Sequence, residues 1–346
     1  MTTTSAPSEA RLLRLPAPFT LDSGASLPGV ELAYRTWGAL SGKGDNAVVV
    51  CHALTGSADV DVWWSAVLGE GRALDPSHDF IVCSNILGSC YGSTGPASPA
   101  ADGLPWGTRF PSLTVRDLVR VQQKLLDALG VRRVKLVVGG SLGGMQALEW
   151  ALLDERVEAA AILAAPARHE AWAIGWSAAQ RHALDTASTP ELGLAAARTI
   201  AMLSYRSPAS LTLRFGRNAG EEARFAIQDW LAHHGRALVQ RFDPHSYRVL
   251  LDVMDRHDVG HDRGGVAAAL RSLQCPVLVL SIETDQLYPP AESEALAGLL
   301  PRAELVRFDS PHGHDGFLIE AARVGVHLKA FRQRVEAQQP SGRGVR

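Results

Sequence analysis

The sequence of 346 residues has few cysteines and no excess of charge of either sign. Its four cysteines (Cys51, Cys83, Cys90 and Cys275) lack the paired spacing of metal sites, so we expect no bound metal. A formal net charge of −2 creates no general attraction for nucleic acid or for an anionic membrane. No apolar run approaches the length of a membrane span. These absences exclude several classes of protein and leave a globular, enzyme-sized one.

The N-terminus also lacks the features of an export signal. Residues 1–7 (MTTTSAP) contain neither a basic region nor an apolar core. We therefore expect a cytoplasmic protein that contacts no membrane. The hydrophobic content of 46% and the charged content of 20% are those of a globular protein with a sizeable core.

Strand-like and helix-like segments alternate along most of the chain. Residues 115–129 carry their apolar side chains on one helical stripe, and Gly130 follows as a helix-ending glycine. Such alternation is typical of parallel strands joined by right-handed crossovers, so the sequence predicts an α/β fold with a mostly parallel central sheet. The predicted strands are 31–36, 47–51, 80–84, 134–138, 159–163, 276–281 and 305–308. Besides 115–129, the predicted helices are 147–153, 291–300 and 321–334.

The segment 168–262 has a different character, because it is rich in alanine and arginine and contains no strand-like run of the buried kind. It predicts an all-helical lid inserted before a late strand. The two parts of the α/β core would then be 16–167 and 263–334, and we expect disordered tails over 1–15 and 335–346. Ligand sites in such sheets lie at the carboxyl ends of the strands, which a lid would cover.

The most informative stretch is 138–146 (VGGSLGGMQ), which lies between a predicted strand and a predicted helix. Strand, Gly-x-Ser-x-Gly and helix in this order form the nucleophile elbow of the α/β-hydrolase fold. Gly139 and Gly143 flank Ser141 because a Cβ at either position would collide with neighbouring elements. The sequence therefore predicts Ser141 as a nucleophile, with the positive end of the following helix directed at it.

The acid of a Ser-His-Asp triad follows the serine along the chain in this fold. Glu283 and Asp285 both follow the predicted strand 276–281. The turn Asp-x-Leu-Tyr-Pro-Pro favours Asp285, whereas Glu283 fits a solvated loop carboxylate better. The acid would hold the imidazole in one tautomer and stabilise the imidazolium.

The histidine of the triad should follow the last strand, 305–308. Both His312 and His314 are available there. We favour His314, which stands between Gly313 and Gly316 at the start of the final helical segment. An imidazole titrates near neutrality, so it suits both deprotonation of the serine and protonation of a leaving group.

An oxyanion hole requires two backbone N–H donors. One should be the amide of Leu142, the residue after the nucleophile. The other should come from the loop 52–56, which follows the predicted strand ending at Cys51. We assign this second donor to the amide of Leu54.

Six motifs occur in order along the chain: HALTG (52–56), CSNILGSCYGSTGP (83–96), FPSLTVRD (110–117), GSLGGMQ (140–146), DQLYPP (285–290) and GHDGF (313–317). Together they closely resemble the homoserine O-acyltransferase family, and within it the homoserine O-acetyltransferases of methionine biosynthesis. The resemblance extends from about residue 16 to residue 332. It implies a homodimer formed through the lid helices, acetyl-CoA as a co-substrate, and no further cofactor.

The resemblance also implies a ping-pong reaction in which Ser141 takes an acetyl group from acetyl-CoA. The hydroxyl of L-homoserine, deprotonated by His314, would then attack the acyl-enzyme. In the family, a lid arginine and a tyrosine seven residues later hold the carboxylate of the amino acid. These positions correspond to Arg198 and Tyr205, and Asp315 would bind the ammonium group.

Three alternatives stay open at this point. The donor could be succinyl-CoA, which related enzymes use. The same triad could hydrolyse an ester, although Arg198 and Asp315, one for each end of an amino acid, argue against water as the acceptor. An inactive relative that serves as a binding scaffold is the third alternative, and the filled triad positions argue against it.

Overall fold

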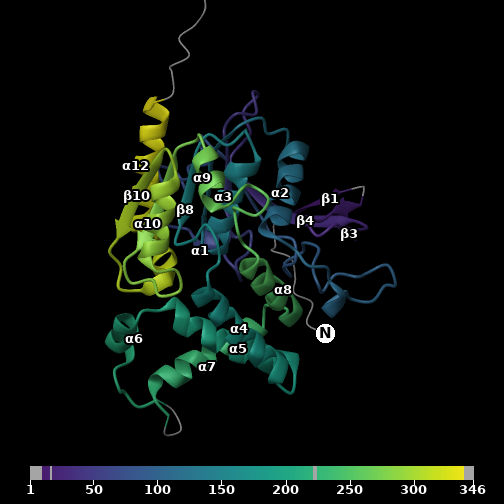
Figure 1. The fold of residues 1–346 in the computed structure, drawn as a ribbon, viewed down its shortest axis with the longest axis vertical. Coiled ribbons are helices and arrows are strands. Elements are labelled where there is room, and N and C mark those ends of the chain that lie inside the picture. Colours follow the sequence, from purple (N-terminus) through teal and green to yellow (C-terminus); the bar gives the residue numbers. More distant parts are fainter. Residues whose placement is uncertain (1–9, 16–17, 221–223, 339–346) are drawn as a thin grey trace, which may run out of the picture.

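The structure is a computed structural model that describes residues 10–15, 18–220 and 224–338. Its centre is a twisted eight-stranded sheet, and a layer of helices lies beyond one end of it (Figure 1). The strands lie in the order β1 (Arg11–Leu15), β4 (Val30–Trp37), β6 (Phe80–Ser84), β5 (Ala47–Cys51), β7 (Val134–Gly140), β8 (Ala160–Leu163), β9 (Val277–Ile282) and β10 (Ala303–Phe308).

The sheet is mostly parallel, as the alternating pattern predicts. The strands from β6 to β10 in this order pair in parallel, whereas β1 and β4 pair antiparallel with each other, and β4 is antiparallel to β6. β5 and β6 are buried along their whole length, because parallel strands covered on both faces meet no water. The helices of the α/β core are α1 (Val60–Trp63), α2 (Val115–Leu129), α3 (Leu142–Leu153), α9 (Val266–Ser272), α10 (Pro290–Leu299), α11 (Gly316–Ile319) and α12 (Ala321–Gln338).

Two hydrophobic clusters divide the core between the faces of the sheet. One cluster includes Leu118 of α2 and Leu148 of α3. The other includes Trp64, which follows α1, and Leu328 of α12. Burial of the apolar stripe of each helix against the sheet supplies the main stabilisation of such a layered fold.

Helix α2 shows why the sequence pattern marks its ends so sharply. The side chain of Thr114 accepts a hydrogen bond from the amide of Asp117, and the Asp117 carboxylate accepts one from the amide of Thr114. This capping box satisfies two amides that the helix leaves without partners. At the other end Gly130 adopts φ = 78°, a left-handed conformation that glycine adopts without strain.

The prediction of disordered tails over 1–15 and 335–346 is wrong for the parts that the structure describes. Residues 11–15 form strand β1, in which the partly buried Leu13 and Leu15 alternate with exposed residues and pack against the core. Helix α12 continues to Gln338, because Val335 is still buried in the core. Residues 1–9 and 339–346 lie outside the described residues. A short hairpin of β2 (Phe19–Thr20) and β3 (Ser26–Leu27), which the sequence pattern does not predict, follows β1.

Of the six helices described between β8 and β9, the first five form an insertion, and α9 belongs with the sheet. In Figure 1 helices α4 to α7 gather below the sheet, and α8 lies between them and the core. None of the helices in the described part of the chain is both long and apolar enough to cross a membrane. The inserted helices are α4 (Ala171–Thr186), α5 (Pro190–Tyr205), α6 (Pro208–Phe215), α7 (Ala226–Val239) and α8 (Pro244–Asp255).

Candidate active site

Ser141 lies at the turn between β7 and α3, in a backbone conformation that few non-glycine residues adopt. Its φ is 58° and its ψ is −127°. A Cβ on Gly139 would lie 2.3 Å from the carbonyl of Gly143, and one on Gly143 would lie 2.1 Å from the carbonyl oxygen of Cys51. Both flanking positions therefore require glycine. Strain of this kind is typical of functional positions, and here it occurs at the predicted nucleophile.

His314 and Asp285 form a buried hydrogen-bonded pair. Nδ1 of His314 donates to Oδ2 of Asp285 over 2.7 Å. Oδ1 of Asp285 accepts hydrogen bonds from the amides of Leu287 and Tyr288, at 2.9 and 3.0 Å. Nε2 of His314 is buried and has no hydrogen-bond partner among the residues that the structure describes. The pair therefore presents the Nε2 lone pair that a general base requires.

The electrostatics of this pair favour a basic imidazole. Burial lowers the pKa of His314, but the negative charge of Asp285, the hydrogen bond to it and the charge of Asp315 together outweigh burial, so that the pKa is raised above its ordinary value. Desolvation opposes the charged form of a histidine, whereas a nearby carboxylate stabilises it. His314 is thus well suited to accept a proton.

The two rejected candidates lie elsewhere. Glu283 is exposed to solvent, although it stands only two residues before Asp285. His312 faces a different set of groups, because its Nδ1 lies 3.3 Å from the hydroxyl of Ser210 and 3.4 Å from the guanidinium of Arg206. The structure therefore brings Asp285 and His314 together and places neither Glu283 nor His312 with them.

The two predicted oxyanion donors lie on a loop and a helix that are linked by hydrogen bonds from one side chain, Gln146. Leu142 is the first residue of α3, and Leu54 lies in the loop after β5. In the described ranges neither amide donates to another protein atom. The side-chain amide of Gln146 donates to the backbone oxygens of both His52 and Leu142, each at 3.2 Å. Gln146, which the sequence analysis did not identify, fixes the position of the loop relative to the elbow helix.

Lid residues approach the candidate triad from α5. The ring of Tyr205 lies 5.6 Å from the ring of His314, and the guanidinium of Arg198 lies 5.5 Å from the Tyr205 ring. Burial raises the pKa of Asp315, and the positive charges of His314, Arg198 and Arg206 oppose this shift. Arg198 and Tyr205, predicted from one lid segment, and Asp315, predicted from the motif that contains His314, thus share one electrostatic environment beside His314.

A second buried histidine supports the loop that carries Asp285. Nε2 of His169 lies 3.1 Å from the hydroxyl of Tyr288, and its Nδ1 lies 3.1 Å from a carboxylate oxygen of Asp255 in α8. The Tyr288 ring contacts the His314 ring edge-on at 5.2 Å. This network connects the lid to the candidate triad. Tyr288 belongs to the motif DQLYPP (285–290), whereas no motif of the sequence analysis contains His169 or Asp255.

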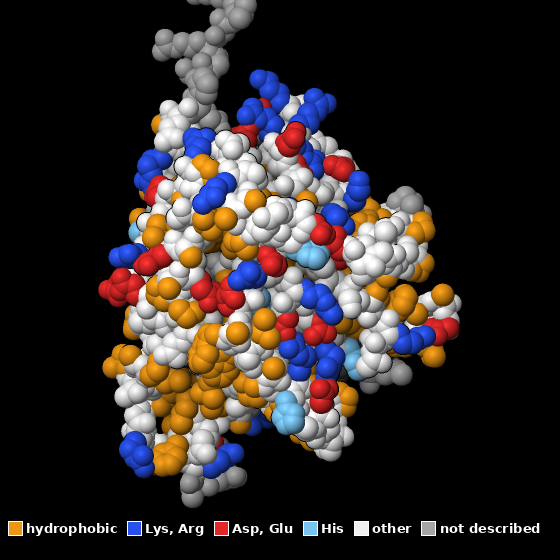
Figure 2. Space-filling model, in the orientation of Figure 1, with side chains coloured by type: hydrophobic (Ala, Val, Ile, Leu, Met, Phe, Trp, Pro, Cys, Tyr) orange, Lys and Arg blue, Asp and Glu red, His pale blue; other side chains and the backbone are white. Residues whose placement is uncertain are grey.

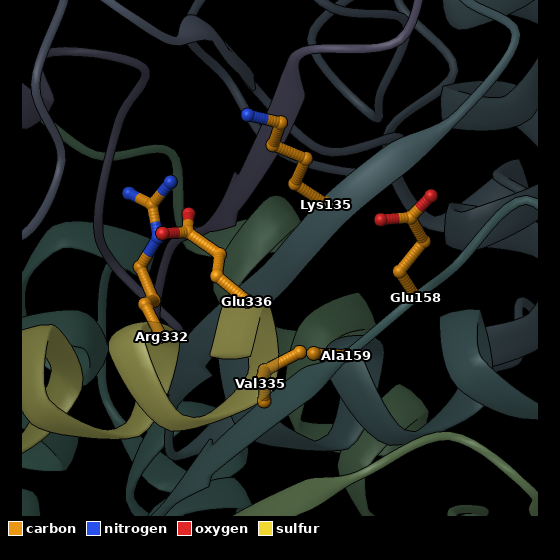
Figure 3. Close-up of a pocket in the computed structure, with 6 residues that line it drawn as sticks. All are labelled: Lys135, Glu158, Ala159, Arg332, Val335 and Glu336. Carbon is orange, nitrogen blue, oxygen red and sulfur yellow. The ribbon is translucent and has the colours of Figure 1, made fainter. Parts of the chain in front are cut away.

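A small cavity of about 60 Å³ lies far from these residues (Figure 3). Its lining includes Lys135, near the start of β7, and Glu158, just before β8. Arg332 and Glu336 of α12 close it on another side. The cavity is therefore at the amino ends of the strands, whereas Ser141, Asp285 and His314 follow the carboxyl ends.

The mostly parallel sheet, the strained serine turn between β7 and α3 and the buried His314–Asp285 pair are features of an α/β-hydrolase-fold enzyme. The protein-family model described as alpha/beta hydrolase fold matches residues 46–321. The homoserine O-acetyltransferase of Trichormus variabilis is 50% identical over 333 residues, which cover 92% of this chain and 92% of that protein. The chain therefore belongs to the homoserine O-acetyltransferase family, a family of acyltransferases.

Solved structures of related folds agree with this architecture. The homoserine O-acetyltransferase of Bacillus anthracis superposes with a TM-score of 0.87 at 20% identity, covering 94% of this chain and 98% of that one. The esterase E22 superposes with a TM-score of 0.86 at 24% identity, covering 94% of this chain and 99% of that one. At such identities the likeness concerns the fold alone.

Proposed function

We propose that this protein transfers an acetyl group from acetyl-CoA to the hydroxyl of L-homoserine, giving O-acetyl-L-homoserine and CoA in methionine biosynthesis. The family membership supports this activity. The observation that carries it is the position of Arg198 and Asp315 beside the His314–Asp285 pair. A cation and a carboxylate next to a general base match the two charged ends of an amino acid whose hydroxyl must be activated.

In the first half-reaction Ser141 attacks the thioester carbonyl and gives its proton to Nε2 of His314. The amides of Leu54 and Leu142 stabilise the negative oxygen of the tetrahedral intermediate. The C–S bond then breaks, and the departing CoA sulfur takes the proton from His314. The product is an acetyl ester of Ser141, and no bound cofactor takes part.

In the second half-reaction homoserine occupies the site that CoA leaves. Arg198 and Tyr205 bind its carboxylate, and Asp315 binds its ammonium group. His314 takes the proton of the homoserine hydroxyl, whose oxygen attacks the acetyl carbon. The bond to the Ser141 oxygen breaks, His314 returns the proton to Ser141, and O-acetylhomoserine departs.

Release of CoA measured with a free-thiol reagent tests this function. The purified protein is incubated with acetyl-CoA in the presence and absence of L-homoserine, and the products are identified by mass spectrometry. Transfer requires homoserine-dependent thiol release together with O-acetylhomoserine. Thiol release at the same rate without homoserine, with acetate as the product, would instead identify a hydrolase.

Asp315→Asn should weaken the use of homoserine while leaving acetylation of Ser141 nearly intact. The neutral amide can still accept a hydrogen bond but cannot form an ion pair with the ammonium group, and hydrogen bonds to charged groups are worth about 1.5–3 kcal/mol. We expect a loss of roughly 10- to 100-fold in kcat/KM for homoserine, a range that corresponds to this free energy. Steady-state kinetics with homoserine and single-turnover acetylation separate the two half-reactions.

Asp309→Asn is the matched control for this substitution, because Asp309 is an exposed carboxylate six residues earlier. It should leave both half-reactions unchanged. An equal loss in both half-reactions for Asp315→Asn would contradict the assignment, and would mean that Asp315 supports His314 instead.

Acetyl-CoA should be preferred over succinyl-CoA by at least about tenfold in kcat/KM, or roughly 1.4 kcal/mol. The loops 52–57 and 88–96 and the elbow 139–146 contain no lysine or arginine to meet the second carboxylate of a succinyl group. A buried carboxylate without a partner costs several kcal/mol. Arg241 does reach these loops, but it donates to the carbonyl of Thr55 and to the hydroxyl of Tyr91.

Parallel measurements of kcat/KM for the two donors, at saturating homoserine, check this preference. S-acetyl and S-succinyl derivatives of N-acetylcysteamine serve as controls, because they carry the same acyl groups without the nucleotide. A preference for the succinyl group with both kinds of thiol would overturn the argument and would indicate a cation in the acyl pocket.

The proposed homodimer through the lid helices fits the apolar surface of the lid. Hydrophobic side chains gather over the lower part of the face drawn in Figure 2, where helices of the lid lie. Light scattering of the purified protein measures the oligomeric state. The cytoplasmic location of the protein stays a prediction. The large apolar side chains that are exposed on the lid segment 168–262 are Trp172, Ile174, Leu192, Leu203, Leu213 and Phe225.

A further inference from the structure

The lid segment 192–220 contains four arginines and no aspartate or glutamate. One of them, Arg206, is 8% exposed, and no carboxylate oxygen of a described residue lies within 4.0 Å of its guanidinium. Arg206 donates to the hydroxyl of Ser210 over 2.8 Å, and its Nε is buried with no partner among the described residues. Burial lowers the pKa of Arg206, and the negative charge of Asp315 opposes this shift without forming an ion pair. A buried guanidinium whose Nε has no partner among the described residues suits an anion that arrives with a ligand.

Aromatic rings and a second arginine surround this side chain. The guanidinium carbon of Arg206 lies 5.9 Å from the centre of the Trp230 ring, and that of Arg214 lies 5.6 Å from it. The Trp230 ring also contacts Phe215 at 5.5 Å and His234 at 4.5 Å. We refer to Arg206, Arg214, Phe215, Trp230 and His234 as the basic–aromatic cluster.

Several positive charges lie near His234 of this cluster. Burial, together with the charges of Arg198, Arg214 and Arg206, lowers the pKa of His234 to about 4. His233, the neighbouring ring at 5.6 Å, contributes to the same shift. Such an excess of positive charge favours a ligand with several negative charges.

The cluster adjoins the loop that carries the general base. A Cβ on Gly313 would lie 2.6 Å from the amide of Ser207, so the loop packs directly on the end of α5. Tyr205 packs on the ring of His314, whereas the next residue, Arg206, contacts His312. Consecutive residues therefore face the acyl-transfer site and the basic–aromatic cluster.

We propose that the basic–aromatic cluster binds the phosphate groups of the acyl-CoA donor. The proposal rests on the function proposed above, in which one substrate is a nucleotide thioester. Guanidinium groups match phosphate oxygens in geometry and charge, and the half-buried rings of Phe215 and Trp230 offer an aromatic surface for the adenine. The carboxylate of homoserine is assigned to Arg198, which leaves Arg206 and Arg214 to the donor.

A comparison of acetyl-CoA with S-acetylpantetheine, which has the same reactive end and no phosphate, tests the proposal. We expect Arg206→Gln and Arg214→Gln each to lower kcat/KM for acetyl-CoA by about 10-fold or more, since each removes a charge-assisted hydrogen bond. The kcat/KM for S-acetylpantetheine should change by less than about twofold, because that donor makes no phosphate contact. Arg217→Gln is the matched control, since Arg217 is exposed and contacts Phe225 rather than Trp230.

Arg206→Lys should recover part of the loss with acetyl-CoA, because it keeps the charge. Equal losses with both donors would show that Arg206 and Arg214 only support the fold, and unchanged kinetics with acetyl-CoA would equally overturn the proposal. Calorimetric titration with adenosine 3′,5′-bisphosphate gives an independent reading: binding should weaken by about 10-fold in Arg214→Gln. If the wild type transferred acetyl groups from neither donor, the proposed function would fail, while this titration would still decide whether the cluster binds nucleotide phosphates.

Discussion

Ser141→Ala should lower kcat by roughly 10⁶-fold, the usual consequence of losing a triad serine. Without the hydroxyl, neither an acetyl-enzyme nor the oxyanion that precedes it can form. The substitution should leave the fold intact, because alanine has the same Cβ and requires the same strained backbone (φ = 58°) as the serine. The expected result is a folded protein without measurable homoserine-dependent thiol release.

Mass spectrometry of the acetylated enzyme makes this test specific. Wild-type protein incubated with acetyl-CoA alone should gain one acetyl group on the peptide that contains Ser141, and Ser141→Ala should gain none. Ser293→Ala removes another buried serine hydroxyl, in α10, and serves as the matched control with near-normal turnover. An unmodified wild-type peptide during normal turnover would rule out the covalent intermediate.

The strands and helices that were predicted correctly are those in which one hydrophobic pattern continues along the whole element. Strands 47–51 and 80–84 and helix 115–129 coincide with β5, β6 and α2, because continuous apolar runs and a long helical stripe are unambiguous. β1 is different, since only Leu13 and Leu15 pack inward and two positions are too few to show a period of two. β7 continues to Gly140, where glycines conceal the strand.

The candidate site shows the same distinction between local and distant information. Chain order and short motifs select Ser141, Asp285 and His314, since each follows the carboxyl end of a strand. The contacts of His169 with Asp255 and Tyr288 join residues 86 and 119 positions apart, so no motif records them. They depend on how the lid packs on the core, which only the three-dimensional structure gives.

Arg206 is a further example of what local sequence cannot decide. Arg198 and Arg206 lie eight residues apart, and the positive charge of each lowers the pKa of Asp315. The difference between them arises where α5 ends at Tyr205, because Arg206 has an extended backbone that directs it toward Ser210 and Trp230. The end of α5 thus separates Arg198, which we propose binds homoserine, from Arg206, which we propose binds the acyl-CoA donor.

Asp285→Asn should lower kcat by roughly 10⁴-fold, although it changes only one atom. Oδ1 of Asp285 accepts hydrogen bonds from the amides of Leu287 and Tyr288. An asparagine must keep its oxygen at this position, so its NH₂ group faces Nδ1 of His314. His314 then has to accept at Nδ1 and carry its proton on Nε2, which is the wrong tautomer for taking a proton from Ser141.

The pH dependence of kcat/KM distinguishes this effect from general damage to the site. Burial lowers the pKa of His314, but the charge of Asp285, the hydrogen bond to it and the charge of Asp315 together raise it above its ordinary value. The base must be unprotonated, so activity falls as the pH drops through this pKa. Removal of the Asp285 charge lowers the pKa and should therefore move the acid limb of the profile to lower pH. The control is Glu283→Gln, which neutralises an exposed carboxylate two residues away and should leave both the rate and the acid limb unchanged. If Asp285→Asn lowered kcat by less than tenfold and did not move the acid limb, Asp285 would not orient the base.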